Sequence, residues 1–163
     1  MAYSKVGISI PKVTGAINIV VSTIEKAVKN LFDASKATLN TRFTSSSTET
    51  KDGVYITDYI DAVAGDEIYV KPAYVTDASN IYDKVNCYNS TSDTKIGAKV
   101  LSSMGESTNN ILFSIENGVG HFTVPAFDGT TRIKIALRHN TSYTAITESD
   151  LANVVITKNE PIS

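Results

Sequence analysis

Apolar and polar residues alternate with a period of two along most of the chain after residue 33. The clearest example is residues 131–138, where Ile133, Ile135 and Leu137 are separated by polar or small residues. Successive side chains of a β-strand point to opposite faces of the sheet, so this pattern predicts a strand with one buried aliphatic face. The charged residues expected on its solvent face are Arg132, Lys134 and Arg138.

The same period recurs in several short segments. Ile111, Phe113 and Ile115 precede an Asn117–Gly118 pair, a typical two-residue turn, and the apolar alternation then resumes at residues 122–124, which predicts a hairpin. Further strands are expected in residues 54–60, 67–70, 81–88, 95–101 and 153–157, with a turn at residues 64–66. About eight short strands with no helical pattern between them predict a mainly β protein, an antiparallel and jelly-roll-like β-sandwich.

The first 33 residues have a different pattern. Ser22 and Glu25 have the spacing of a capping box, which predicts a helix over residues 23–32. From residue 13 to residue 31, apolar residues step by four and three, the spacing of a heptad seam, and β-branched residues at both core positions favour three or four strands. Three arrangements fit: an oligomeric helix, a helix folded onto its own domain, and, because Ile17, Ile19 and Val21 alternate, a strand before the helix.

This change of pattern predicts two parts: an arm and helix in residues 1–33, for docking or oligomerisation, and a sandwich in residues 34–163. The residues expected to mediate oligomerisation are Ile17, Val20, Ile24, Ala27, Val28 and Leu31.

Composition narrows the class of protein. The chain has 163 residues, of which 42% are hydrophobic and 20% charged, values typical of a folded globular domain. Its net charge of -2 does not favour a nucleic-acid partner, and no apolar run approaches the length of a membrane span, so we expect no membrane insertion. The single cysteine, Cys87, is expected to be a buried thiol.

Residues suited to catalysis are few. His121 and His139 are the two histidines, neither lies in a nucleophile motif, and strand parity places His121 toward solvent. The carboxylates are scattered and lack the spacing of a calcium loop. The sequence therefore predicts no enzyme, no cofactor and no metal site.

The tyrosines are the more informative polar residues. Parity places Tyr55 and Tyr59 opposite Val54 and Ile56, and Tyr69 opposite Ile68. Tyrosines on an outer face either stabilise the sheet through cross-strand pairs, contact another subunit, or bind a ligand such as a sugar. The residues proposed for ligand binding are Tyr82, Lys84 and Tyr88, which share one face with Asn86.

Several segments resemble bacteriophage tail and receptor-binding virion proteins, including accessory domains of tail fibres and baseplates. They are residues 30–40 (NLFDASKATLN), 57–60 (TDYI), 64–70 (AGDEIYV), 122–126 (FTVPA), 131–135 (TRIKI), 149–157 (SDLANVVIT) and 159–161 (NEP). The resemblance implies a carbohydrate-binding-like β-sandwich and transfers no individual binding residue.

From this resemblance we expect a non-enzymatic virion structural protein, a homotrimeric tail fibre or baseplate component with a head that binds host surface glycan. Its other partners would be virion proteins, and it would be made in the host bacterial cytoplasm and located in the virion. The alternative is a capsid, collar or tail decoration protein that binds only other virion proteins.

Overall fold

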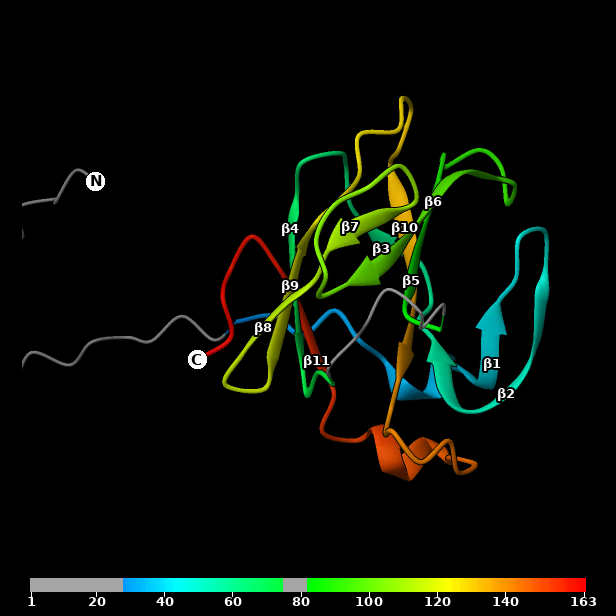
Figure 1. Cartoon of the computed structure of the whole chain (residues 1–163), viewed down its shortest axis with the longest axis vertical. Helices are drawn as coiled ribbons and strands as arrows, with labels where there is room; N and C mark the ends of the chain where they lie inside the picture. The colour runs from blue at the N-terminus through cyan, green and yellow to red at the C-terminus, as the bar shows by residue number, and fades with distance from the viewer. Residues whose placement is uncertain (1–27, 75–81) are drawn as a thin grey trace, which may run out of the picture.

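Two β-sheets face each other and enclose the apolar core (Figure 1). The computed structural model describes residues 28–74 and 82–163. Its strands are β1 (Thr38–Phe43), β2 (Thr48–Ile56), β3 (Ile60–Asp61), β4 (Glu67–Lys71), β5 (Lys84–Tyr88), β6 (Lys95–Ser102), β7 (Asn110–Leu112), β8 (Ser114–Glu116), β9 (Val119–Thr123), β10 (Arg132–Arg138) and β11 (Val155–Lys158). Two 3₁₀ turns, η1 (Ala34–Lys36) and η2 (Glu148–Leu151), complete the set.

The larger sheet has the order β1-β2-β10-β5-β6-β7, with β3 paired to β10, and the smaller has the order β11-β4-β9-β8. Neighbouring strands are antiparallel except β6 and β7, which are parallel. The prediction of a mainly β, two-layer fold is therefore confirmed, with one parallel pair that it did not include.

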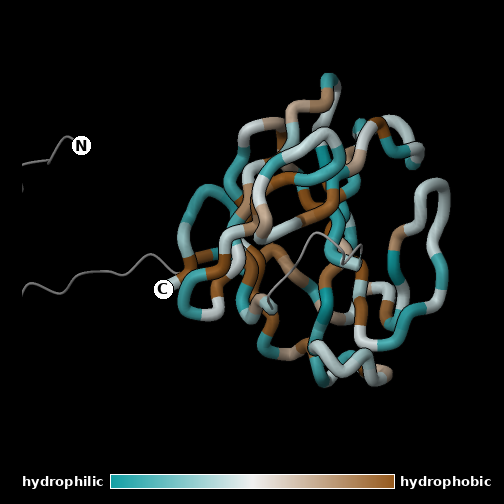
Figure 2. The backbone as a smooth tube through the Cα atoms, in the orientation of Figure 1, coloured by the Kyte–Doolittle hydropathy of each residue, from teal (hydrophilic) through white to brown (hydrophobic). Residues whose placement is uncertain are grey.

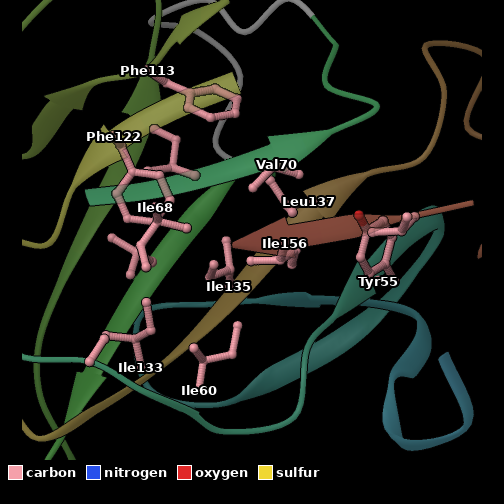
Figure 3. Close-up of a cluster of buried hydrophobic side chains, with 14 of the residues drawn as sticks. Tyr55, Ile60, Ile68, Val70, Phe113, Phe122, Ile133, Ile135, Leu137 and Ile156 are labelled. Atoms are coloured by element: carbon pink, nitrogen blue, oxygen red, sulfur yellow. The ribbon is translucent and has the colours of Figure 1, made fainter. Parts of the chain in front are cut away.

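The core lies between the two sheets. Ile133 and Ile135 of β10, with exposed fractions of 0%, contribute from the large sheet, and Ile68 and Val70 of β4 contribute from the small sheet. Figure 3 shows these side chains converging with those of Phe113, Phe122 and Ile156. Figure 2 shows hydrophobic segments gathered in the middle of the molecule and hydrophilic ones along its outer loops. Apolar burial between the sheets is therefore the main stabilising contribution to the fold.

The hairpin predicted around Asn117–Gly118 is present as β8 and β9. Both turn residues have positive φ, 51° at Asn117 and 77° at Gly118, as a two-residue type I′ turn requires. The preceding alternation, however, is divided between the two sheets: β7 belongs to the large sheet and β8 to the small one. Phe113 lies at this crossover, and its ring packs directly over Gly120 of β9, where a side chain would collide with it.

The helix predicted over residues 23–32 is wrong for the part that the structure describes, because residues 28–33 are not helical. Residues 23–27 lie outside the described residues. The Asn30 side chain binds the backbone at the start of strand β11, donating to the carbonyl of the preceding residue Val154 at 3.0 Å and accepting from the Ile156 N–H at 2.9 Å. The Leu31 N–H donates to the Ile156 carbonyl at 2.8 Å. These bonds hold residues 30 and 31 along β11, where the predicted helix would have ended.

The predicted orientation of strand β2 is also wrong. Tyr55 points into the main core, whereas Val54 and Ile56 point to the outer face of the large sheet. They are nonetheless buried there, in a second apolar cluster with Phe43 and Ala136, covered by Tyr82 and Tyr143. Because both faces of β2 are apolar in this region, alternation alone could not tell the inner face from the outer one.

The solvent-facing position predicted for Arg138 is also wrong. It was expected in solvent, but its side chain is only 6% exposed and forms an ion pair with the 4% exposed Asp83 at 2.7 Å. The Arg138 N–H also donates to Asp83 at 2.8 Å. A buried arginine is accommodated here because a carboxylate neutralises it and accepts its hydrogen bonds.

Candidate functional site

A groove of about 510 Å³ crosses the outer face of the large sheet. One side is the turn of the β1–β2 hairpin, which projects from the sheet at the right of Figure 1, and the other is the segment from β5 to the start of β6. Its lining residues are Phe43, Ser46, Ser47, Thr48, Asn86, Tyr88, Asp93, Thr94 and Lys95. The groove thus combines two aromatic rings with hydroxyl, amide, carboxylate and ammonium groups.

Asn86 and Tyr88 line the groove from strand β5. They alternate with the core residues Val85 and Cys87, so the strand pleat places them on the outer face, as the sequence predicted. Both are nonetheless buried, with exposed fractions of 3% and 7%. The Asn86 amide donates to the Tyr88 hydroxyl at 3.3 Å, while its Oδ1 atom has no partner among the described residues. Burial raises the pKa of Tyr88, although the bond from Asn86 opposes this effect.

Tyr59, Arg132 and Asp93 form a connected cluster beside Tyr88. The Tyr59 ring meets the Tyr88 ring edge-on, with centroids 5.2 Å apart, and the Arg132 guanidinium lies 3.7 Å above the Tyr59 centroid. The Tyr59 hydroxyl donates to Asp93 at 2.9 Å, and Arg132 binds the same carboxylate at 3.1 Å. Burial, together with the bond to Asp93, raises the pKa of Tyr59 to about 12. Tyr59 therefore stays protonated and can donate its hydrogen bond at physiological pH.

Two lysines connect the sheet to the β1–β2 hairpin. Lys84 donates to the Thr44 carbonyl at 3.3 Å, and Lys95 donates to the Ser45 carbonyl. Neither forms an ion pair with a carboxylate in the described part of the chain. Burial lowers the pKa of Lys84, and the positive charges of Lys95 and Arg42 lower it further. The edge of the groove therefore carries like charges close to one another.

The three predicted ligand-binding residues are placed differently. Tyr88 lines the groove, and Lys84 contacts the hairpin that forms one of its sides. Tyr82 belongs instead to the second apolar cluster, where its ring meets the Tyr143 ring at 5.2 Å. The positions of Phe43 and Asp93 in the groove, and the pairing of Arg132 with Asp93, were not predicted from the sequence. The polar residues 44–47 between two strand-like segments were the one available signal for a hairpin, since such residues favour turns.

A second hollow, of about 390 Å³, lies on the outer face of the small sheet. His121 stacks on Tyr69 at 4.6 Å and pairs with Glu67 through Nε2, while the Ser114 hydroxyl lies 3.5 Å from Nδ1. The order serine, histidine, carboxylate resembles a hydrolase triad. The 3.5 Å separation is too long for efficient proton transfer, and Ser114 and His121 are direct cross-strand partners. We interpret the row as cross-strand stabilisation of the sheet.

The predicted oligomerisation residues lie only partly within the described chain. Leu31 packs against the main core, and Val28 is 42% exposed. Ile17, Val20, Ile24 and Ala27 lie outside the described residues. The Leu31 side chain thus packs within its own domain.

Cys87 is buried in the core as predicted, and burial raises the pKa of its thiol to about 11. Among residues 28–74 and 82–163, no group of three or more His, Cys, Asp or Glu side chains is placed to hold a metal ion. Within the same ranges, no helix is long and apolar enough to cross a membrane.

Comparison of the chain with protein-family models, curated proteins and solved structures finds no match.

Proposed function

We propose that this chain is a non-enzymatic bacteriophage virion protein, a homotrimeric tail fibre or baseplate component whose β-sandwich binds host surface glycan. The resemblance of the segments between residues 30 and 161 to phage receptor-binding proteins supports the virion role. The observation that carries the binding role is the groove on the outer face of the large sheet.

The groove offers what a saccharide requires. Sugars present many hydroxyl groups and a few apolar C–H surfaces, and sites for them combine apolar surface with convergent hydrogen-bonding groups. Here Phe43 and Tyr88 supply the apolar surface, while Asn86 and Asp93 supply an amide and a carboxylate. The unpartnered oxygen of Asn86 is a buried acceptor that a small rearrangement would make available to a sugar hydroxyl.

The binding role is tested by co-sedimentation of the full chain with cell envelopes purified from a panel of bacteria. We expect retention on envelopes of the host, and about three- to tenfold weaker retention for Tyr88→Phe, since that variant loses one hydroxyl group. Ser114→Ala, in the second hollow, is the matched control and should bind as the parent does. Absence of retention on every envelope would reject glycan binding and favour the decoration protein.

The virion role needs a separate experiment. Immunogold labelling with antibody against the full chain should mark the tail tip or baseplate of phage particles, and light scattering should give the mass of a trimer. Label on the capsid or collar would favour the decoration protein, and a monomer would contradict the trimer.

A further inference from the structure

Positive side chains are concentrated around the outer face of the large sheet. They are Arg42, Lys51, Lys84, Lys95, Arg132, Lys134 and Arg138. In the described part of the chain, carboxylates pair with three of them: Glu49 with Arg42, Asp93 with Arg132 and Asp83 with Arg138. The other four cations form no ion pair there, although the whole chain has a net charge of -2. The charge is therefore local to this face and does not reflect the composition of the chain.

The cations also occupy the aromatic faces that a neutral sugar ring would use. Arg132 and Lys134 lie 3.7 and 4.3 Å from the Tyr59 centroid. Lys51 lies 4.6 Å from the Tyr82 centroid and 4.3 Å from that of Tyr143. Stacking of a sugar on these tyrosines would have to displace a cation that the ring already attracts. At these three tyrosines, the groups left to meet a ligand are the charged ends of the lysines and arginines.

We infer that this face selects an anionic polysaccharide, one that carries carboxylate or phosphate groups along its chain. An anion near Lys84 and Lys95 would relieve the repulsion between neighbouring positive charges, which hydroxyl groups cannot do. Sugar hydroxyls beside each anionic group would bind Asn86 and Asp93 in the groove. This inference rests on the proposed glycan-binding function and adds the chemical class of the glycan.

The test measures binding of the full chain to four immobilised polymers: alginate, which carries carboxylates, poly(glycerol phosphate) teichoic acid, neutral dextran, and alginate whose carboxylates have been esterified. We expect binding to alginate or to teichoic acid, whichever carries the preferred anionic group, and at least about tenfold weaker binding to both neutral polymers. The interaction should weaken as salt rises from about 0.05 M to about 0.5 M, because salt screens exposed charges.

The double variant Lys84→Ala/Lys95→Ala tests the location. It should lose at least about tenfold in affinity for the acidic polymer and show a flatter salt dependence. Lys71→Ala/Lys99→Ala is the matched control, since neither of these lysines lines the groove, and it should bind as the parent does. Thermal unfolding of each variant establishes that it is folded.

The outcomes separate the two proposals. Equal binding to neutral and acidic polymers, or an unchanged Lys84→Ala/Lys95→Ala variant, would overturn the anionic selectivity and leave glycan binding in place. Tighter binding to a single-stranded DNA oligonucleotide than to either acidic polysaccharide would also overturn it. If the chain binds none of the four polymers, the anionic selectivity is overturned. Glycan binding itself is rejected only if the bacterial envelopes are not bound either.

Discussion

The two faces of strand β10 are stabilised in different ways. On the inner face, Ile133 and Ile135 are fully buried among aliphatic and aromatic side chains from both sheets. On the outer face, Ala136 is buried in a small apolar cluster, whereas Arg132 and Arg138 are held by the carboxylates of Asp93 and Asp83. The inner face depends on shape and volume, and the outer face depends on charges placed against specific partners.

This difference shows how the large sheet can carry polar and charged side chains on its outer face without loss of stability. Many inner residues share the apolar burial, so the apolar cluster on the outer face around Ala136 can be small. The outer face can then hold polar and charged side chains, some of them nearly buried. Each of those depends on one or two partners and is therefore sensitive to a single change.

The largest expected effect is on the outer face. Asp83→Ala should lower the free energy of unfolding by about 3–5 kcal/mol, because Arg138 would remain buried without its counter-charge. Urea-induced unfolding followed by circular dichroism measures the change. The double variant Asp83→Leu/Arg138→Met, which removes both charges, should recover most of the loss. A loss below about 1 kcal/mol for Asp83→Ala would show that the ion pair is not a structural requirement.

A smaller effect is expected in the core between the sheets, at Gly120 of strand β9 in the small sheet. Gly120→Ala should cost about 1–3 kcal/mol, because the new methyl group would collide with the Phe113 ring and the Ala73 side chain. The same unfolding experiment measures it. If shape is the cause, Phe113→Leu combined with Gly120→Ala should cost less than the sum of the two single changes. Strict additivity would indicate that the glycine is needed for another reason.

The smallest effect concerns pH. The pKa of Lys84 is lowered in the folded protein, first by burial and then by Lys95 and Arg42, so the protonated lysine is less favourable in the folded state than in the unfolded state. The free energy of unfolding should therefore gain a contribution as pH rises through the folded pKa toward the unfolded value of 10.5. Lys84→Met should remove this contribution, measured as the difference in unfolding temperature from the parent across that range.

The sequence predicted those parts of the fold that depend on local alternation. Ile133, Ile135 and Leu137 face the core as expected, and the Asn117–Gly118 turn forms its hairpin. Local pattern could not indicate that Tyr55 is the inward residue of β2, since this depends on which strands lie on either side of it. Nor could it show that Arg138 is buried, because the partner Asp83 is 55 residues away.

The candidate site was predictable only in outline. Strand parity correctly placed Lys84 and Tyr88 on one outer face, but it gave no information about what lies across from them. The groove exists because the β1–β2 hairpin projects beside β5, and Asp93, which lines it, is paired with Arg132 from a distant segment. The occupation of tyrosine faces by cations likewise depends on neighbours that only the folded sheet brings together.

The bonds from Asn30 and Leu31 to β11 have a consequence for assembly. β11 is an outer strand of the small sheet, and such a strand can template the addition of a strand from another molecule. Here the incoming polypeptide already occupies its exposed donors and acceptors at residues 154 and 156. Aggregation by edge-to-edge β-pairing is therefore blocked at this point of β11.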